Sequence, residues 1–306
     1  MGRLDEILSG GRSRVTHGFA TPHGSLDELD PSLTALFHEK IRPKERVRHI
    51  ITAPSQTVLE KREGFQLWMR WISTPTCTLV LTDQRLLIAE VDQPGAEPDL
   101  HFIPLADILS MELGKILLYA WMDLSWAADG EVRRQRVFFN TVGEYLFHQV
   151  VSDICRSRIR RAQRKPSTTD RNLAILENLP YKFKNIIAGR LLLPDEAAQS
   201  LVFRKAIWNR MLGVFKRMTA PAQALLLTNY HILVMREDTG HAGSNYGVIF
   251  RYFPLDGVSE AVISEDGGLV RLELRMRRDN AQENVGMLFN EGERQALSAI
   301  FSRWME

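Results

Sequence analysis

Several short strand-like runs of apolar residues are separated by turn-forming residues along the chain, which predicts β-strands. Three of these stretches are CTLVLTD (77–83), RLLIAEV (85–91) and RRQRVFFN (133–140). Two other stretches have the 3.6-residue period of amphipathic helices. Their apolar faces comprise Leu146, Phe147, Val150, Val151 and Ile154 in the first, and Leu297, Ile300, Phe301 and Trp304 in the second. The pattern predicts a mainly β protein with helices (α+β), in which antiparallel strands precede each amphipathic helix.

One strand phrase occurs twice, as TLVLTDQRLLI (78–88) and ALLLTNYHILV (224–234). The flanking landmarks also recur in the same order, namely Pro43 with Pro194, Pro75 with Pro221, Pro104 with Pro254, and Phe139-Asn140 with Phe289-Asn290. Landmarks repeated in one order indicate a duplicated unit. We therefore expect Thr82-Asp83 and Thr228-Asn229 to form equivalent hairpin turns.

Each unit is predicted to begin with a short helix and to end with a capped one. The opening segments are DPSLTALFHEKI (30–41) and LPYKFKNIIAG (179–189), with proline in the first turn. Before the closing helices, Thr141 with Glu144 and Asn290 with Glu293 have capping-box spacing.

This order of motifs resembles the bacterial pleckstrin-homology-like (PH/GRAM-like) domain family over roughly 32–164 and 181–306. The first copy has the family's T-D-x-R-L phrase, whereas the second has Asn229 and His231 in it. The resemblance implies two tandem PH-like domains, each an antiparallel, partly open β-barrel closed by its C-terminal amphipathic helix. The predicted organisation is a flexible N-terminal arm (1–28), domain 1 (29–165), a linker (166–179) and domain 2 (180–306).

Composition changes this picture little. The 306 residues carry a formal net charge of +2, which does not require nucleic acid or a membrane as partner. Two cysteines in a chain of this length favour a reducing compartment. No apolar run reaches the ~18 residues that a transmembrane helix needs. We expect a cytoplasmic protein, with peripheral attachment to the inner membrane face as the alternative.

Candidate catalytic chemistry is sparse. The histidines and cysteines lack the spacing of a metal site, and no nucleophile, base and orienting group can be assembled. PH-like domains carry no common catalytic residues, so the resemblance implies no activity. We expect no enzyme, no cofactor, no metal and no nucleic-acid partner.

Tryptophan is concentrated in two strand-like stretches of the first unit. FQLWMRW (65–71) and LLYAWMDLSW (117–126) contain four of the six tryptophans, which are Trp68, Trp71, Trp121 and Trp126. Either these side chains fill the core, or they form an interface between domains or subunits, where tryptophan is favoured. The pattern leaves both interpretations open.

Two basic segments are candidate anion-binding or lipid-binding sites. RSRIRRAQRK (156–165) contains Arg156, Arg160 and Arg164, and FRKAIWNRMLGVFKRM (203–218) contains Arg204, Lys205, Arg210, Lys216 and Arg217. In lipid-binding relatives, basic residues around the hairpin of the second segment hold headgroup phosphates. The alternative for the first segment is that its cations complement the helix dipole and keep a linker soluble.

The functional hypothesis from sequence is a non-enzymatic adaptor or scaffold that binds a protein partner, or self-associates, through tandem PH-like domains. The alternative is peripheral binding to anionic membrane lipids through domain 2 and the basic linker.

Overall fold

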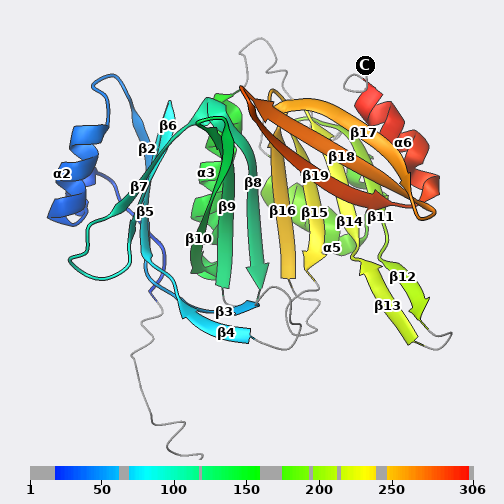
Figure 1. Cartoon of the computed structure of the whole chain (residues 1–306), viewed down its shortest axis with the longest axis horizontal. Helices are drawn as coiled ribbons and strands as arrows, with labels where there is room; N and C mark the ends of the chain where they lie inside the picture. The colour runs from blue at the N-terminus through cyan, green and yellow to red at the C-terminus, as the bar shows by residue number, and fades with distance from the viewer. Residues whose placement is uncertain are drawn as a thin grey trace, which may run out of the picture.

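The structure is a computed structural model that describes residues 18–61, 69–116, 119–158, 174–192, 196–211, 215–238 and 247–302. It is mainly β and built from antiparallel sheets, which confirms the α+β class (Figure 1). Among the described residues no sheet closes into a barrel. We call 18–158 the first half and 174–302 the second half.

The first half begins with a short strand and a helix that pack on the sheet that follows. Its elements are β1 (Thr21–Pro22), η1 (Leu26–Glu28), α2 (Pro31–Lys40), β2 (Val47–Ala53), β3 (Thr57–Lys61), β4 (Met69–Ser73), β5 (Thr76–Thr82), β6 (Arg85–Val91), β7 (Asp99–Pro104), η2 (Leu105–Asp107), β8 (Ile108–Ile116), β9 (Tyr119–Ala128), β10 (Glu131–Asn140), η3 (Thr141–Gly143) and α3 (Glu144–Ser157). Of the predicted N-terminal arm, 1–17 lies outside the described residues, whereas β1 pairs with β2.

The second half runs through the same order of helix, strands and closing helix. Its elements are α5 (Tyr181–Ile186), η5 (Ile187–Leu191), β11 (Ala198–Arg204), β12 (Ile207–Met211), β13 (Phe215–Ala220), β14 (Gln223–Thr228), β15 (His231–Asp238), β16 (Gly247–Pro254), β17 (Val258–Asp266), β18 (Leu269–Arg278), β19 (Ala281–Phe289), η6 (Glu291–Glu293) and α6 (Arg294–Phe301). In both halves a two-stranded hairpin, β3–β4 or β12–β13, interrupts the first pair of long strands.

The repeated T-D/N turn has the same hydrogen bonds in both halves. The Thr82 hydroxyl accepts the backbone N–H groups of Gln84 and Arg85, and donates to the Arg85 carbonyl. The Thr228 hydroxyl makes the equivalent three bonds with Tyr230 and His231. The strands end at the threonines, so each two-residue turn begins one position later than the sequence predicted.

In each half, the carboxylate of a buried glutamate lies beside the basic residue that follows the turn. The Glu45 carboxylate accepts from Arg85 Nε at 2.9 Å, and its side chain is fully buried. In the second half, Glu196 Oε1 lies 3.3 Å from His231 Nε2, again with both side chains buried. Burial lowers the pKa of His231, although the charge of Glu196 opposes this shift. The duplication thus extends from the sequence to individual polar contacts.

The halves share a sheet, and this corrects the expectation of two self-contained barrels. A seven-stranded sheet has the order β10-β9-β8-β16-β15-β14-β11, because β8 of the first half pairs with β16 of the second (Figure 1). Edge strands expose unpaired backbone groups, and pairing two edges satisfies them. The remaining sheets are β1-β2-β5-β6-β7, β17-β18-β19 and the two hairpins.

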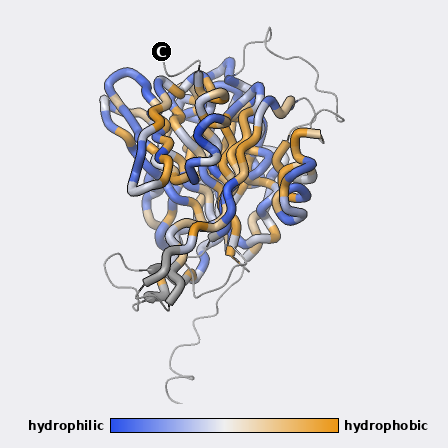
Figure 2. Tube along the Cα trace, turned by 90° about the vertical axis from the view of Figure 1, so that its right-hand side faces the viewer, coloured by the Kyte–Doolittle hydropathy of each residue, from blue (hydrophilic) through white to orange (hydrophobic). Residues whose placement is uncertain are grey.

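Two cores lie on opposite faces of the shared sheet. The larger core contains the apolar face of α3 and extends across the sheet to Phe183 and Ile187 under the second half. The smaller core lies between the second-half strands, β17–β19 and α6, and contains Leu297, Ile300 and Phe301. Figure 2 shows hydrophobic positions gathered on the interior strands. The helical periodicity therefore predicted the described buried residues of both closing helices correctly.

The capping predictions had different outcomes. Glu293 accepts from the backbone N–H and the side-chain amide of Asn290, which confirms the second capping box. In the first half, the predicted capping box of Thr141 and Glu144 is wrong. The side chain of Asn140 caps the turn instead, because it accepts a hydrogen bond from the Val142 N–H. The Glu144 carboxylate is instead held by Lys115 at 2.9 Å and by His148.

We expect Thr228→Val to lower the free energy of unfolding by about 1–3 kcal/mol, because two buried backbone N–H groups lose their acceptor. Thr82→Val should behave alike in the first half. Urea denaturation measures both, with Thr228→Ser as the control that retains the hydroxyl. Equal stability of the valine and serine variants would contradict the assigned role.

Candidate functional site

The cross-strand register brings distant polar residues into one row on a face of the seven-stranded sheet. Consecutive partners from β11 to β10 are Arg204, Gln223, Arg236, Ile249, Gly114, Trp121 and Phe138. Directly opposed residues in neighbouring strands have adjacent side chains. The row therefore begins with a polar group in the second half and ends with an aromatic group in the first.

A cavity of about 230 Å³ lies over the second-half end of this row. We call it the arginine cavity, and its charged or amide-bearing lining residues are Arg204, Gln223, Arg236 and Arg251. Its apolar lining includes Val234, Ile249, Phe253 and Met287. No described residue that lines it is acidic. The cavity is consequently rich in hydrogen-bond donors and positive charge.

Arg204 is the deepest cation of the site, with only 1% of its surface exposed. Its Nη2 donates to the Pro221 carbonyl. Within the described part of the chain, its Nε and Nη1 have no hydrogen-bond partner. Burial lowers the pKa of the guanidinium to about 10, although the negative charge of Glu293 opposes the shift. At neutral pH the group is therefore still a cation, and two of its donors are buried without a partner in the described chain.

Gln223 and Arg251 add further donors to the arginine cavity. Gln223 is 5% exposed, and its Nε2 has no partner among the described residues; the same holds for Arg251 Nε. Arg236 is half-exposed at the rim, and its nearest described carboxylate is Glu112 at 3.7 Å. A buried donor without a partner is unfavourable, and an anionic ligand would supply the missing acceptors.

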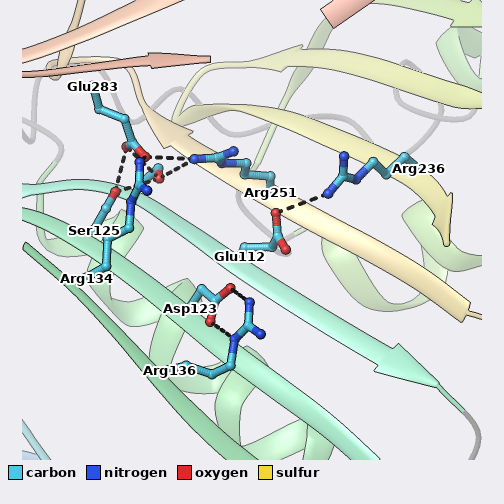
Figure 3. Close-up of polar contacts among 9 residues, drawn as sticks. Glu112, Asp123, Ser125, Arg134, Arg136, Arg236, Arg251 and Glu283 are labelled. Carbon is cyan, nitrogen blue, oxygen red and sulfur yellow. Dashed lines mark hydrogen bonds and ion pairs between the residues drawn. The ribbon is translucent and has the colours of Figure 1, made fainter. Parts of the chain in front are cut away.

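Arg251 also belongs to a polar cluster that joins the halves (Figure 3). Its Nη2 donates to Glu283 at 2.9 Å and to Ser110 at 3.2 Å. Glu283 comes from β19, is almost fully buried, and also accepts from Ser125 at 2.6 Å and from Arg134 at 3.3 Å. One carboxylate thus links β19 and β16 of the second half to three strands of the first.

Beyond this cluster, the same face of the first half carries an ion pair and a guanidinium that lies near an aromatic ring. Arg136 binds Asp123 through two hydrogen bonds of 2.6 and 2.5 Å (Figure 3). The same guanidinium lies 5.8 Å from the Trp121 ring centroid, within the range of a cation–π interaction. Burial raises the pKa of Glu112, whereas the neighbouring Arg236 and Arg251 charges lower it. The acidic and basic side chains on this part of the face therefore form ion pairs with one another.

The first half has different chemistry at the positions equivalent to the arginine cavity. Counting from Thr82 and Thr228, the strand registers match Arg204 with Ala53, Gln223 with Cys77, Arg236 with Glu90, and Arg251 with His101. Ala53 and Cys77 are both buried. The three arginines are consequently a property of the second half alone.

The structure places the predicted cations in different environments. Arg204 lines the cavity, whereas the adjacent Lys205 is exposed. Arg210, Lys216 and Arg217 belong to β12 and β13, but their side chains are outside the described residues.

The basic linker is described only at its beginning, since Arg160 and Arg164 lie outside the described residues. Arg156 forms an ion pair with Asp153 at 3.4 Å. Arg158 is buried and pairs with Asp256 of the second half at 2.9 Å. These contacts favour a structural role for both described cations.

Of the four tryptophans singled out in the sequence, the two whose side chains are described are buried. Trp121 is 5% exposed and packs with Ile116 and with Ile249 of the other half. Trp126 lies in the larger core. Trp68 lies outside the described residues, as does the side chain of Trp71.

Sequence reasoning missed Gln223, Arg236, Arg251 and Glu283. The only local signal was a single arginine within the apolar strand IFRYFP (249–254). The other contacts follow from strand register between segments distant in sequence.

A scan against protein-family models found no matching family, and a search of curated proteins found no significant match. Among the described residues, no helix is long and apolar enough to cross a membrane. The described part of the chain also contains no group of three or more His, Cys, Asp or Glu side chains placed to hold a metal ion.

We expect Glu283→Ala to lower the free energy of unfolding by about 3–5 kcal/mol, because removing one partner of a buried ion pair leaves an uncompensated charge. Arg134→Ala is the matched control. Its side chain is 72% exposed, so the expected loss is under about 1 kcal/mol. Urea denaturation should separate the two variants, and similar losses would exclude a special role for Glu283.

Proposed function

We propose that the protein is a non-enzymatic binding module of two tandem PH-like units, and that the second unit binds an anionic group in the arginine cavity. The observation that carries the proposal is Arg204, a buried cation with two donors unpartnered among the described residues, in a cavity without a described acidic lining residue. Charge-assisted hydrogen bonds from guanidinium groups are the strong interactions by which proteins hold carboxylates and phosphates.

The repeated elements and turn contacts support the tandem PH-like assignment. In each half, antiparallel strands precede one amphipathic helix that packs against them, an order that agrees with the resemblance, although no described sheet closes into a barrel. The anionic group can belong to a soluble ligand or to a lipid headgroup. Both sources share the chemistry of the cavity.

We expect isothermal titration calorimetry to detect binding of at least one of inorganic phosphate, sulfate and acetate to the full chain. Arg204→Met should weaken that binding about 10- to 100-fold, since a hydrogen bond to a charged group contributes about 1.5–3 kcal/mol. The same variant should unfold at an unchanged or higher temperature, because it removes unpartnered buried donors. Lys205→Ala removes a neighbouring exposed charge and should bind like the wild type.

Unchanged anion binding by Arg204→Met would contradict the proposed function. Flotation with phosphatidylglycerol vesicles identifies the source of the anion. Vesicle binding that requires Arg204 would indicate a lipid headgroup, whereas binding of soluble anions alone would indicate a soluble ligand.

A second candidate function is docking of a protein partner, as the sequence hypothesis held. A groove of about 770 Å³ runs along α3, and its lining includes Val142 and Tyr145, which are 64% and 57% exposed. The rest of the lining is mostly polar, so these two exposed side chains are the observation that favours a contact here.

If the α3 groove joins two copies of the chain, sedimentation velocity should show dimers of the wild type. The double variant Val142→Asp, Tyr145→Asp should then be monomeric, because charge would be buried in the contact. The exposed substitution Lys205→Ala serves as control. A wild type that stays monomeric at high concentration would rule out self-association through this groove.

A further inference from the structure

The walls of the arginine cavity restrict the kind of anion that suits it. Besides the donors, the lining includes Val234, Ile249, Phe253 and Met287, which are apolar and buried. A small, strongly hydrated anion that entered would lose its water and gain contact with hydrocarbon on these sides, which is unfavourable. A ligand with both an anionic head and an apolar part would satisfy the two kinds of surface.

The size of the cavity sets an upper limit on the apolar part. Its volume of about 230 Å³ is below the roughly 300–1,000 Å³ of typical drug-sized ligand pockets. A short aliphatic chain fits this volume better than the paired acyl chains of a membrane lipid. The ligand would therefore enter as a small molecule.

The donors favour a planar head group of low charge. Guanidinium groups match carboxylates in geometry, and the two can form paired hydrogen bonds. Arg251 is already bound to Glu283, and Arg236 lies near Glu112, so part of the positive charge is compensated by the protein. Arg204 has no ion pair among the described contacts, although the charge of Glu293 acts on it, so a single negative charge suits the site.

We propose that the ligand of the arginine cavity is a monocarboxylate with a short aliphatic chain. Its carboxylate accepts hydrogen bonds from Arg204 and Gln223, and its chain lies against Val234, Ile249 and Met287. This inference rests on the proposed function, because it specifies the anion that the second unit binds.

Titration calorimetry of the full chain with acetate, butyrate, hexanoate and octanoate tests the inference. Each added methylene that is buried should tighten binding about fourfold until the cavity is filled. Hexanol, which has the chain without the charge, should bind at least tenfold more weakly than hexanoate. This comparison uses the wild type alone and needs no variant to fold.

Hexanoate binding can also be measured for variants in which a cavity residue is replaced by its first-half equivalent. Arg204→Ala and Gln223→Cys install the residues that occupy the equivalent buried positions, Ala53 and Cys77. Arg204→Ala should weaken hexanoate binding at least tenfold, whereas Lys205→Ala should not change it.

The outcomes distinguish the inference from the proposed function. If phosphate or acetate binds through Arg204 and affinity does not rise with chain length, the carboxylate inference is overturned and the proposed function stands. If hexanol binds as tightly as hexanoate, the inference also fails. If no anion binds, both are wrong.

Discussion

The backbone pairing of β8 with β16 is the constraint on which the rest of the structure depends. It joins a three-stranded and a four-stranded group into one sheet, so that the outer face of the first half continues directly into the inner face of the second. Because Gly114 has no side chain, the indole ring of Trp121 can lie directly against its backbone, in the row that includes Ile249. A Cβ at this position would overlap the indole ring of Trp121. The polar cluster around Glu283 and the packing of Trp121 both follow from this junction.

The same junction explains why the arginine cavity and the inter-half cluster are neighbours. Arg251 lies on β16, the strand that pairs with the other half, and its guanidinium contributes to both sites. Its Nε is buried without a described partner, while its Nη2 donates to Glu283. A ligand that contacted Arg251 would share one guanidinium with the inter-half ion pair, so the proposed binding and that ion pair would be coupled.

Local sequence patterns predicted what depends on local physics. The apolar faces of both closing helices were predicted correctly, since Val150 and Leu297 follow a period that is visible in the sequence. The repeat located Thr82 and Thr228, whose shared bonds need only the turn itself. By contrast, β8–β16 pairing could not be predicted, because nothing in either strand specifies a partner more than a hundred residues away. The candidate site was likewise predictable only in part. Arg204 was singled out by composition, but its burial depends on packing that composition does not encode.

Comparison of the two halves also indicates that the charge of Arg204 is not needed for folding. Where the first half folds with Ala53, the second half carries a guanidinium that is desolvated and only partly hydrogen-bonded within the described chain. Packing alone does not require the charge, because the equivalent position in a unit of the same topology accommodates a methyl group. Unpartnered buried donors oppose folding by about 1–3 kcal/mol each. A ligand that supplies acceptors and binds only the folded state opposes that cost, since it stabilises the fold by RT ln(1 + [L]/Kd). The unpartnered donors of Arg204 are thus unfavourable for the isolated fold and favourable for an anionic ligand.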